Sequence, residues 1–373
     1  MKIAILGTRG IPNHYGGFEQ FAEIISVNLV KLGHEITVYN PHFHSYKENF
    51  FNDVKIKRAY SPEKYIGAAA NFIYDYLCFR DALKSDFDII LECGYHSNAP
   101  SYYLMKKTTK PVLITNMDGI EWKRSKWNNF TRKLIEKLEK LAVDKSDYLV
   151  SDNIGIQKYY QKKYNVDSYC IAYGADLINN FNVGLLEDYK VESQKYFILI
   201  ARLEPENNIE TILDAFCQSQ SDFPFLVIGN YNTKYGDYVK HKYKNNKIFF
   251  CGGIYDKKRL DSLRKYALAY FHGHSVGGTN PSLLEAMASQ AFIVAHENEF
   301  NQSILEGNAL YFKGKNDLKT IIADLSSFSL TKRQLFIANN CIAIENRYAW
   351  DLITKEYETL FIKVLKEKGR NVG

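Results

Sequence analysis

The sequence predicts an α/β protein with two parallel-sheet domains, and three observations lead to this prediction. The chain has 373 residues, which is more than a single hydrophobic core usually serves. Residues 2–7 and 35–39 are short apolar runs on either side of an amphipathic segment at 18–31, as expected of a βαβ unit. After a weakly patterned stretch that ends near residue 195, a second series of the same kind begins.

Both series consist of short apolar runs separated by helical stretches. The further strands expected are 88–91, 112–115 and 148–151 in the first series and 196–201, 225–228, 247–250, 268–271 and 292–295 in the second. In the amphipathic helix at 129–145, we expect Leu134, Leu138 and Leu141 to face inward. We therefore assign residues 1–180 to one domain and residues 181–340 to the other.

Composition and charge restrict the class of protein. The hydrophobic content of 46% and the charged content of 24% are those of an ordered globular chain. The six cysteines form no CxxC pair, which favours a reducing compartment and argues against a structural zinc site. No signal-peptide pattern and no apolar run of membrane-spanning length is present, so we expect a cytoplasmic protein.

The positive charge is concentrated in one segment. The whole chain carries a net charge of +6, and residues 101–165 alone contain 14 Lys and Arg against 7 Asp and Glu, a net charge of +7. This segment could contact an anionic membrane or an acidic substrate, or it could be an ordinary solvated helical face. The two interpretations carry equal weight, and we expect no nucleic-acid partner.

The segment 272–288 is the most informative part of the chain for function. Its glycines allow a tight turn and close approach to a ligand, and it leads directly into a helix. The residues able to cap or begin that helix are Thr279, Asn280, Pro281 and Ser282. Free N–H groups at such a helix start favour a phosphate, and Glu285 one turn further could accept hydrogen bonds from a pair of sugar hydroxyls. The alternative is a glycine-rich turn that binds nothing.

Two other loops at strand ends could contact phosphate. Gly16 and Gly17 lie in the loop after the first strand, where open α/β sheets bind ligands. This loop lacks GxGxxG, which disfavours a nicotinamide enzyme. Arg202 follows the first strand of the second domain and could bind phosphate oxygens with two N–H groups. The alternatives are a glycine pair needed only for its turn and an arginine in a surface ion pair.

A third group of polar residues suggests a site for a polar ring compound. It follows the strand at 112–115 and contains Asp118, Glu121, Trp122 and Arg124. A sugar can stack on an aromatic ring while carboxylates bind its hydroxyls; a tryptophan buried in a domain wall is the competing interpretation. His96 also follows a strand, although a single histidine is more often structural.

Asp86 and Asp88 match the DxD pattern of metal-dependent sugar transferases. They precede a strand rather than follow one, at the edge opposite the expected ligand site. We therefore interpret them as part of a strand-entry loop and expect no metal.

Five segments in this order resemble motifs of the retaining GT-B glycosyltransferases of family 4. They are Gly16-Gly17-Phe18-Glu19 (GGxE), residues 31–38, Tyr173-Gly174-Ala175-Asp176 (NGVD), residues 201–206 (GRLxPE) and residues 283–288 (LEAMA). Residues 7–17, 118–126 and 272–285 further resemble a bacterial subgroup that includes rhamnosyltransferases of capsule and O-antigen assembly. The resemblance extends over nearly the whole chain.

The chain departs from the family pattern at two positions. Asn207 stands where the family usually has a lysine that binds the diphosphate, and Gly277 stands where it usually has a glutamate. Because one cation and one anion are lost together, the net charge of the pocket is unchanged. His274 and Asn280 are the candidates to replace the missing contacts.

The resemblance implies two Rossmann-like domains facing across a cleft, with helices in residues 341–373 packing back on the first domain. It places the nucleotide-sugar donor in the second domain, with Glu285 on the ribose and Gly253 and Ile254 near the base. The residues implied at the diphosphate and donor sugar are Arg202, His274, Gly278, Thr279, Asn280 and Pro281, together with Gly16 and Gly17 of the first domain. No metal and no further cofactor are implied.

The acceptor is implied on the first domain. Asp118, Glu121 and His96 are the candidate catalytic residues, and Arg9, Trp122 and Arg124 are the candidate acceptor-binding residues. The implied reaction moves a hexose or deoxyhexose, such as rhamnose from dTDP-rhamnose, to a lipid-linked or oligosaccharide acceptor in cell-surface polysaccharide synthesis. The enzyme would then work at the inner face of the plasma membrane. The alternative is a nucleotide-sugar-binding scaffold that has lost catalysis through Asn207 and Gly277.

Overall fold

Two sheets, one in each half of the chain, form the framework of the protein. A computed structural model describes residues 1–14, 16–105, 111–117, 119–124, 127–244 and 247–370. By their contacts these fall into a first unit (Met1–Trp122, Trp127–Tyr173 and Trp350–Gly373) and a second unit (Lys123–Lys126 and Gly174–Ala349). The predicted fold class, α/β with two parallel-sheet domains, is confirmed.

The sheet of the first unit has the strand order β3-β4-β2-β1-β5-β6-β7-β8. Its strands are β1 (Lys2–Leu6), β2 (Glu35–Pro41), β3 (Phe50–Phe51), β4 (Val54–Ala59), β5 (Ile89–Cys93), β6 (Val112–Asn116), β7 (Tyr148–Ser151) and β8 (Tyr169–Cys170). All described pairs are parallel except β3 with β4. The chain builds outward from β1 in both directions, so the order reverses between β1 and β5.

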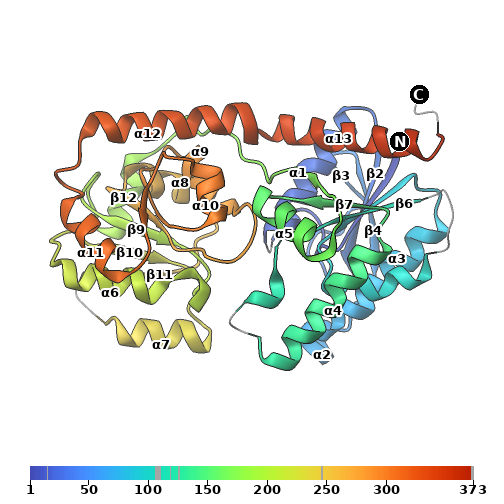
Figure 1. Cartoon of the computed structure of the whole chain (residues 1–373), viewed down its shortest axis with the longest axis horizontal. Helices are drawn as coiled ribbons and strands as arrows, with labels where there is room; N and C mark the ends of the chain where they lie inside the picture. The colour runs from blue at the N-terminus through green and yellow to red at the C-terminus, as the bar shows by residue number, and fades with distance from the viewer. Residues whose placement is uncertain (15, 106–110, 118, 125–126, 245–246, 371–373) are drawn as a thin grey trace. The chain divides into compact units, whose positions relative to one another are not determined.

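Helices cover both faces of this sheet. They are α1 (Gly17–Lys31), α2 (Glu63–Ile66), η1 (Gly67–Ala69), α3 (Ala70–Lys84), η2 (Ala99–Leu104), η3 (Glu121–Lys123), α4 (Asn129–Lys145), α5 (Ile154–Tyr164) and α13 (Trp350–Glu367). Figure 1 shows α1 and α13 on one face and α3 and α4 on the other.

One expectation about α4 is wrong. Leu138 is buried as expected, but Leu134 is 44% exposed, and its neighbour Ile135 occupies the inward position instead. Ile135, Leu138 and Ala142 lie three and four residues apart, so they form a single stripe along one side of the helix. Leu134 lies just outside that stripe.

The second unit is built on a fully parallel sheet with the order β11-β10-β9-β12-β13-β14. Its strands are β9 (Phe197–Ile200), β10 (Phe225–Ile228), β11 (Ile248–Gly252), β12 (Ala269–His272), β13 (Ile293–His296) and β14 (Leu310–Phe312). Phe197, Phe225 and Phe271 pack ring against ring in its core. Here the strand order reverses between β9 and β12.

The helical segments of the second unit connect these strands and follow the last of them. They are η4 (Val183–Tyr189), η5 (Pro205–Asn207), α6 (Ile209–Ser219), α7 (Lys234–Lys242), α8 (Lys257–Tyr266), α9 (Pro281–Ala288), α10 (Glu299–Leu305), α11 (Lys315–Asp324), α12 (Leu330–Ala343) and η6 (Ile344–Tyr348). None of the helices within the described ranges is long and apolar enough to cross a membrane.

Candidate active site

The loops after β9 and β12 are joined to each other at the carboxyl end of the second sheet. The Ser275 hydroxyl donates to the Glu206 carbonyl oxygen at 2.7 Å, and the Asn208 amide donates to the Gly273 carbonyl oxygen at 2.7 Å. A Cβ on Gly273 would lie 2.0 Å from the backbone oxygen of Asn207, so only glycine allows this approach. Because the strand order reverses between β9 and β12, these loops border the crevice in which open α/β sheets bind ligands.

The start of α9 opens onto the same edge of the sheet. Asn280 is the residue that caps this helix, since its side-chain oxygen accepts from the Ser282 N–H at 2.9 Å. Pro281 is the first helical residue, as expected. Gly278 and Thr279 lie in the loop immediately before the cap, and Thr279 is buried. The N–H groups of a helix start and the positive end of its dipole favour an anion at this point.

Glu285 is oriented by an arginine that the sequence reasoning missed. Arg264 on α8 is fully buried, and its guanidinium donates to Glu285 Oε2 at 2.6 Å and to Asp261 Oδ1 at 3.2 Å. The Ser289 hydroxyl also donates to Asp261, at 3.0 Å. Glu285 keeps 24% of its side chain exposed, so its carboxylate is fixed from behind while part of it faces solvent. No local pattern signals this contact because the partners lie 21 residues apart.

Two stacked histidines line the loop after β12. The rings of His272 and His274 are 4.6 Å apart and nearly parallel, at 14°. Burial lowers the pKa of His272 to about 3. Burial, the neighbouring His272 and the charge of Arg202 hold the pKa of His274 well below its usual value. Both imidazoles are therefore neutral near pH 7, and Arg202, which is itself exposed, supplies the positive charge.

The two departures from the family pattern have structural roles. Asn207 is buried, and its side-chain amide donates to the Arg202 carbonyl oxygen at 2.7 Å, which braces the turn that presents the arginine. Gly277 has a φ of +127°, a backbone conformation that residues with a side chain rarely adopt. A glutamate at this position would therefore require a different loop conformation.

Gly253 and Ile254 follow β11, two strands away from β9 on the same carboxyl edge. A Cβ on Gly253 would lie 3.1 Å from the Tyr255 hydroxyl. The second unit thus brings together the predicted donor residues Arg202, His274, Gly278–Pro281 and Glu285, with Gly253 and Ile254 further along the edge. Gly16 and Gly17 belong to the first unit.

In the first unit, the loop after β1 is fixed by polar contacts. Arg9 makes two hydrogen bonds to carboxylates. Its backbone N–H donates to Glu19 Oε1 at 2.8 Å, and its guanidinium donates to Glu63 Oε1 at 3.0 Å. Gly16 is the cap residue of α1, and Gly17 is its first residue and accepts from the Tyr173 hydroxyl at 3.3 Å. The guanidinium of Arg9 thus already has a carboxylate partner within its own unit.

Two buried carboxyl groups lie under this loop. Burial raises the pKa of Asp75 on α3 to about 7. Burial and the charge of Asp75 raise the pKa of Glu92 on β5 to about 8. The Asn98 amide donates to Glu92 Oε2 at 2.6 Å and to the Gly94 carbonyl oxygen at 2.9 Å, which ties this carboxyl group to the segment that precedes His96.

Because the pKa values of these two carboxyl groups are raised in the folded chain, we expect the free energy of unfolding to fall as pH rises. The folded chain keeps their protons to higher pH than the unfolded chain, so the free energy of unfolding should decrease from about pH 4.5 and level off above the folded pKa of Glu92, about 8. Each group can contribute a slope of up to about 1.4 kcal/mol per pH unit. Urea unfolding between pH 5 and 8 should show a shallower decrease for Glu92→Gln than for the wild type. Glu187→Gln on the exposed η4 should retain the wild-type slope, and equal slopes in all three proteins would contradict the assignment.

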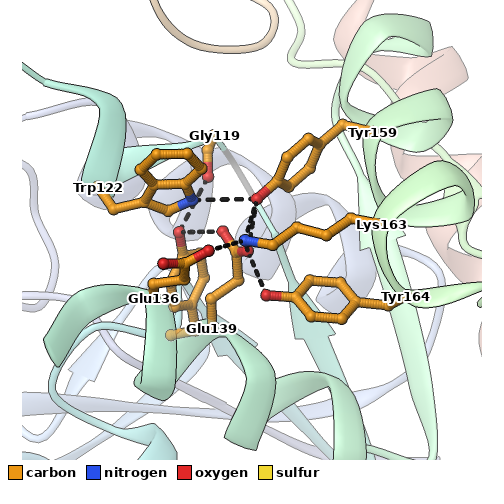
Figure 2. A network of polar contacts seen from close by, with 8 residues as sticks. Gly119, Trp122, Glu136, Glu139, Tyr159, Lys163 and Tyr164 are labelled. Atoms are coloured by element: carbon orange, nitrogen blue, oxygen red, sulfur yellow. Dashed lines mark hydrogen bonds and ion pairs between the residues drawn. The ribbon is translucent and has the colours of Figure 1, made fainter. Parts of the chain in front are cut away.

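A polar network fixes Trp122, the predicted sugar-stacking residue (Figure 2). Its indole N–H donates to the Tyr159 hydroxyl at 3.0 Å, and the Lys163 ammonium lies 4.7 Å from the centre of its ring. The hydroxyls of Tyr159 and Tyr164 each donate to Glu139 Oε1 at 2.7 Å. Glu139, on α4, is completely buried and connects this loop to α5.

The same carboxylate reaches the loop after β5. The Tyr95 hydroxyl lies 3.2 Å from both Glu139 Oε2 and the Gly119 carbonyl oxygen. Tyr95 directly precedes His96, whose Nε2 atom is buried without a hydrogen-bond partner among the described residues. Glu139 therefore joins the two loops that carry the predicted acceptor residues. No pattern in the sequence indicates this role, because an acidic residue within a basic helix is usually expected to face solvent.

Glu121 and Asp118 were predicted as catalytic residues, and Arg124 was predicted to bind the acceptor. Glu121 Oε1 accepts from the Trp127 indole N–H at 3.2 Å. Arg124 groups with the second unit rather than the first. Asp118 lies outside the described residues. The first unit thus brings His96, Glu121 and Trp122 to the loops that follow β5 and β6.

Removing the Tyr159 hydroxyl should loosen this network. In Tyr159→Phe, the Trp122 indole N–H and the Glu139 carboxylate both lose a partner, and the free energy of unfolding should fall by about 1–3 kcal/mol. Urea unfolding measures the change. Tyr148→Phe is the matched control, since the Tyr148 hydroxyl donates to Glu367 at an exposed site, and it should cost less than about 0.5 kcal/mol. Equal losses in the two variants would show that the network has no special role.

Residues 187–335 match the family described as glycosyl transferases group 1. These residues therefore resemble a glycosyltransferase domain. Residues 1–176 match a family described as a domain of unknown function, DUF1972.

Similar proteins extend over the full length of the chain. An uncharacterized glycosyltransferase of Methanocaldococcus jannaschii is 24% identical, over 98% of this chain and 99% of that protein. Sucrose-phosphate synthase from Thermosynechococcus elongatus has a TM-score of 0.80 at 14% identity, over 98% of this chain and 99% of its own. HepE of Anabaena, solved in complex with UDP, has a TM-score of 0.70 at 16% identity, over 96% of this chain and 99% of its own. These structures share the two-domain fold.

Proposed function

We propose that the protein is a retaining glycosyltransferase that moves a hexose or deoxyhexose from a nucleoside-diphosphate sugar to a saccharide acceptor. The observation that carries this proposal is the pair of joined loops at the reversal point of the second sheet. They present an exposed arginine, a helix start and an oriented carboxylate on one edge. The group 1 glycosyltransferase match over the same residues supports it, as does the similarity to a structure solved with UDP.

The donor residues have complementary tasks. Arg202 and the N–H groups of Gly278–Pro281 neutralise the diphosphate, and Glu285, fixed by Arg264, accepts hydrogen bonds from the ribose hydroxyls. Gly253 and Ile254 lie near the base, and neutral His274 contacts the donor sugar. Charge develops on the diphosphate as the sugar leaves, so preorganised positive groups stabilise the transition state without a metal.

The acceptor binds the first unit beside Trp122. In the reaction, the bond between C1 of the sugar and the diphosphate oxygen breaks as a bond from C1 to the acceptor oxygen forms on the same face. The acceptor proton passes to the departing diphosphate. Glu121, Asp118 and His96 orient the hydroxyl, while Arg9 and Arg124 contact polar groups of the acceptor. We propose a lipid-linked saccharide as acceptor and rhamnose, from dTDP-rhamnose, as the transferred sugar, in cell-surface polysaccharide synthesis.

A binding scaffold without catalysis is the second candidate. The observation that favours it is the structural use of Asn207 and Gly277, neither of which offers a charge to the donor. A scaffold would bind a nucleotide sugar without consuming it.

The two candidates are separated by measuring turnover. Purified protein is incubated with UDP-, GDP- and dTDP-sugars, dTDP-rhamnose included, and with lipid-linked saccharides, and released nucleoside diphosphate is quantified. A transferase releases nucleoside diphosphate with at least one donor and forms a product with the donor's anomeric configuration, which NMR shows. Binding without release supports the scaffold. Neither binding nor release with any donor would exclude both candidates.

A further inference from the structure

A pair of hydroxyl groups joins three elements of the second unit. Tyr270 on β12 is completely buried, and its hydroxyl oxygen lies 2.8 Å from the hydroxyl oxygen of Ser282 on α9. Each of these two oxygens is 3.4 Å from the carbonyl oxygen of Ile200 on β9. One hydroxyl donates to the other, and the second donates to the Ile200 carbonyl, so both protons have an acceptor in either direction. Burial raises the pKa of Tyr270 above its usual value, so its hydroxyl stays protonated at neutral pH.

The elements joined by this pair carry the proposed diphosphate contacts. Ile200 is the last residue of β9, and Arg202 follows it by two residues. Ser282 is the second residue of α9, and its N–H donates to the cap residue Asn280 at 2.9 Å. The Tyr270 hydroxyl is also 3.4 Å from the Ser282 carbonyl oxygen. The pair thus connects the strand end that presents the arginine to the first turn of the helix.

Strand pairing explains how Tyr270 reaches both elements. Its backbone lies opposite Ile198 of β9, and its side chain extends along the sheet as far as Ile200. The next residue, Phe271, points to the other face of the sheet, where its ring packs against Phe197. A phenylalanine at position 270 would fill the same space, but it would leave β9 and α9 without this connection.

A second buried tyrosine shows that burial alone does not dictate this arrangement. Tyr196 directly precedes β9 and is also completely buried, and its hydroxyl donates to the Leu263 carbonyl oxygen at 2.5 Å. This bond lies at the opposite end of β9 from Ile200 and joins the strand to α8. The hydroxyl of any buried tyrosine needs a partner. The two tyrosines therefore differ in what the hydroxyl connects, while their burial is the same.

We propose that Tyr270 is a positioning residue for the donor diphosphate, because its hydroxyl, together with that of Ser282, fixes the start of α9 relative to Arg202. In the proposed function, on which this inference rests, these two elements neutralise the diphosphate together. Preorganised groups stabilise developing charge only while each is held in place, and a displacement of about 1 Å can lower a rate about 100-fold. Tyr270 acts without touching the donor, because its side chain is completely buried.

Tyr270→Phe tests this role because it removes only the hydroxyl oxygen. Initial rates are measured with the nucleotide sugar from which the wild type releases nucleoside diphosphate. The variant should lower kcat about tenfold while the donor KM stays within about threefold, because misplaced groups cost most where charge develops. Ser282→Ala should have a similar effect, and the two changes together should lower kcat little further, because each removes the same contact.

Tyr196→Phe is the matched control, since it also removes one fully buried hydroxyl that donates to a backbone carbonyl oxygen. The melting temperatures of Tyr196→Phe and Tyr270→Phe should fall by similar amounts. The kcat of Tyr196→Phe should nevertheless stay within about twofold of the wild type. This comparison separates a role in positioning from a role in stability alone.

A double-mutant cycle with Arg202→Ala shows whether the Tyr270 hydroxyl acts through the arginine. In the Arg202→Ala background, Tyr270→Phe should lower kcat by less than about twofold, because no guanidinium remains to be positioned. An unchanged kcat in Tyr270→Phe would overturn the inference, as would an equal loss in Tyr196→Phe or an undiminished loss in the Arg202→Ala background. These outcomes leave the proposed function standing, because the wild type is active in each. A wild type that releases no nucleoside diphosphate from any donor contradicts the proposed function, and the positioning role falls with it.

Discussion

Replacing Glu285 with alanine should lower kcat/KM for the nucleotide-sugar donor about 100-fold or more. A hydrogen bond to a charged group contributes about 1.5–3 kcal/mol, and the carboxylate is proposed to accept from two ribose hydroxyls. The loss should appear mainly as a higher KM for the donor, because the ribose is bound similarly in the ground state and the transition state. Initial rates against donor concentration measure it.

This variant also disturbs a buried ion pair, so its folding must be followed. Without Glu285, Arg264 keeps Asp261 as its partner, and the melting temperature should fall without loss of the fold. Glu285→Gln keeps an oxygen for Arg264 and should be more stable than the alanine variant, while still losing donor affinity. Glu299→Ala on α10 is the matched control, since Glu299 is exposed and lies outside the proposed site. A kcat/KM within about threefold of wild type for Glu285→Ala would contradict its role.

Replacing Arg202 with alanine should lower kcat about 100- to 1,000-fold, as expected when a group that stabilises developing charge is lost. The effect on kcat should exceed the effect on the donor KM, because the diphosphate gains charge as the bond to the sugar breaks. Arg202→Lys should restore only part of the rate, since an ammonium cannot make the paired contacts of a guanidinium.

The turn that carries Arg202 should remain intact in these variants, because Asn207 binds its backbone oxygen rather than its side chain. Lys319→Ala on α11 removes an exposed cation elsewhere in the second unit and should leave kcat unchanged. A wild-type kcat in Arg202→Ala would show that the arginine does not act on the leaving group. An equal loss in both variants would point to a general effect of charge.

The fold could be predicted because its main strands are continuous apolar runs. β1, β5, β9 and β12 are nearly fully buried, and such runs with helices between them indicate parallel strands. Strands without that pattern were not anticipated. β4 alternates apolar residues with lysines, and β3 has only two residues.

Contacts between distant residues could not be predicted. Arg264 and Glu139 look like ordinary helix-surface charges, and only the folded chain shows each of them buried with several partners. The sequence also could not decide whether Leu134 or Ile135 is the inward residue of α4, because this depends on contacts with distant residues. A helical period permits two adjacent apolar stripes, and packing against other elements selects one of them.

The central claim is that Arg202, the start of α9 and Glu285 form a nucleoside-diphosphate site in the second unit. A thermal-shift series with UDP, GDP and dTDP tests it most directly, because a ligand that binds the folded state raises the melting temperature. At least one nucleotide should raise the melting temperature of the wild type, and none should raise that of the Arg202→Ala, Glu285→Ala double variant. A wild type that responds to no nucleotide, or a double variant that responds as the wild type does, would contradict the claim.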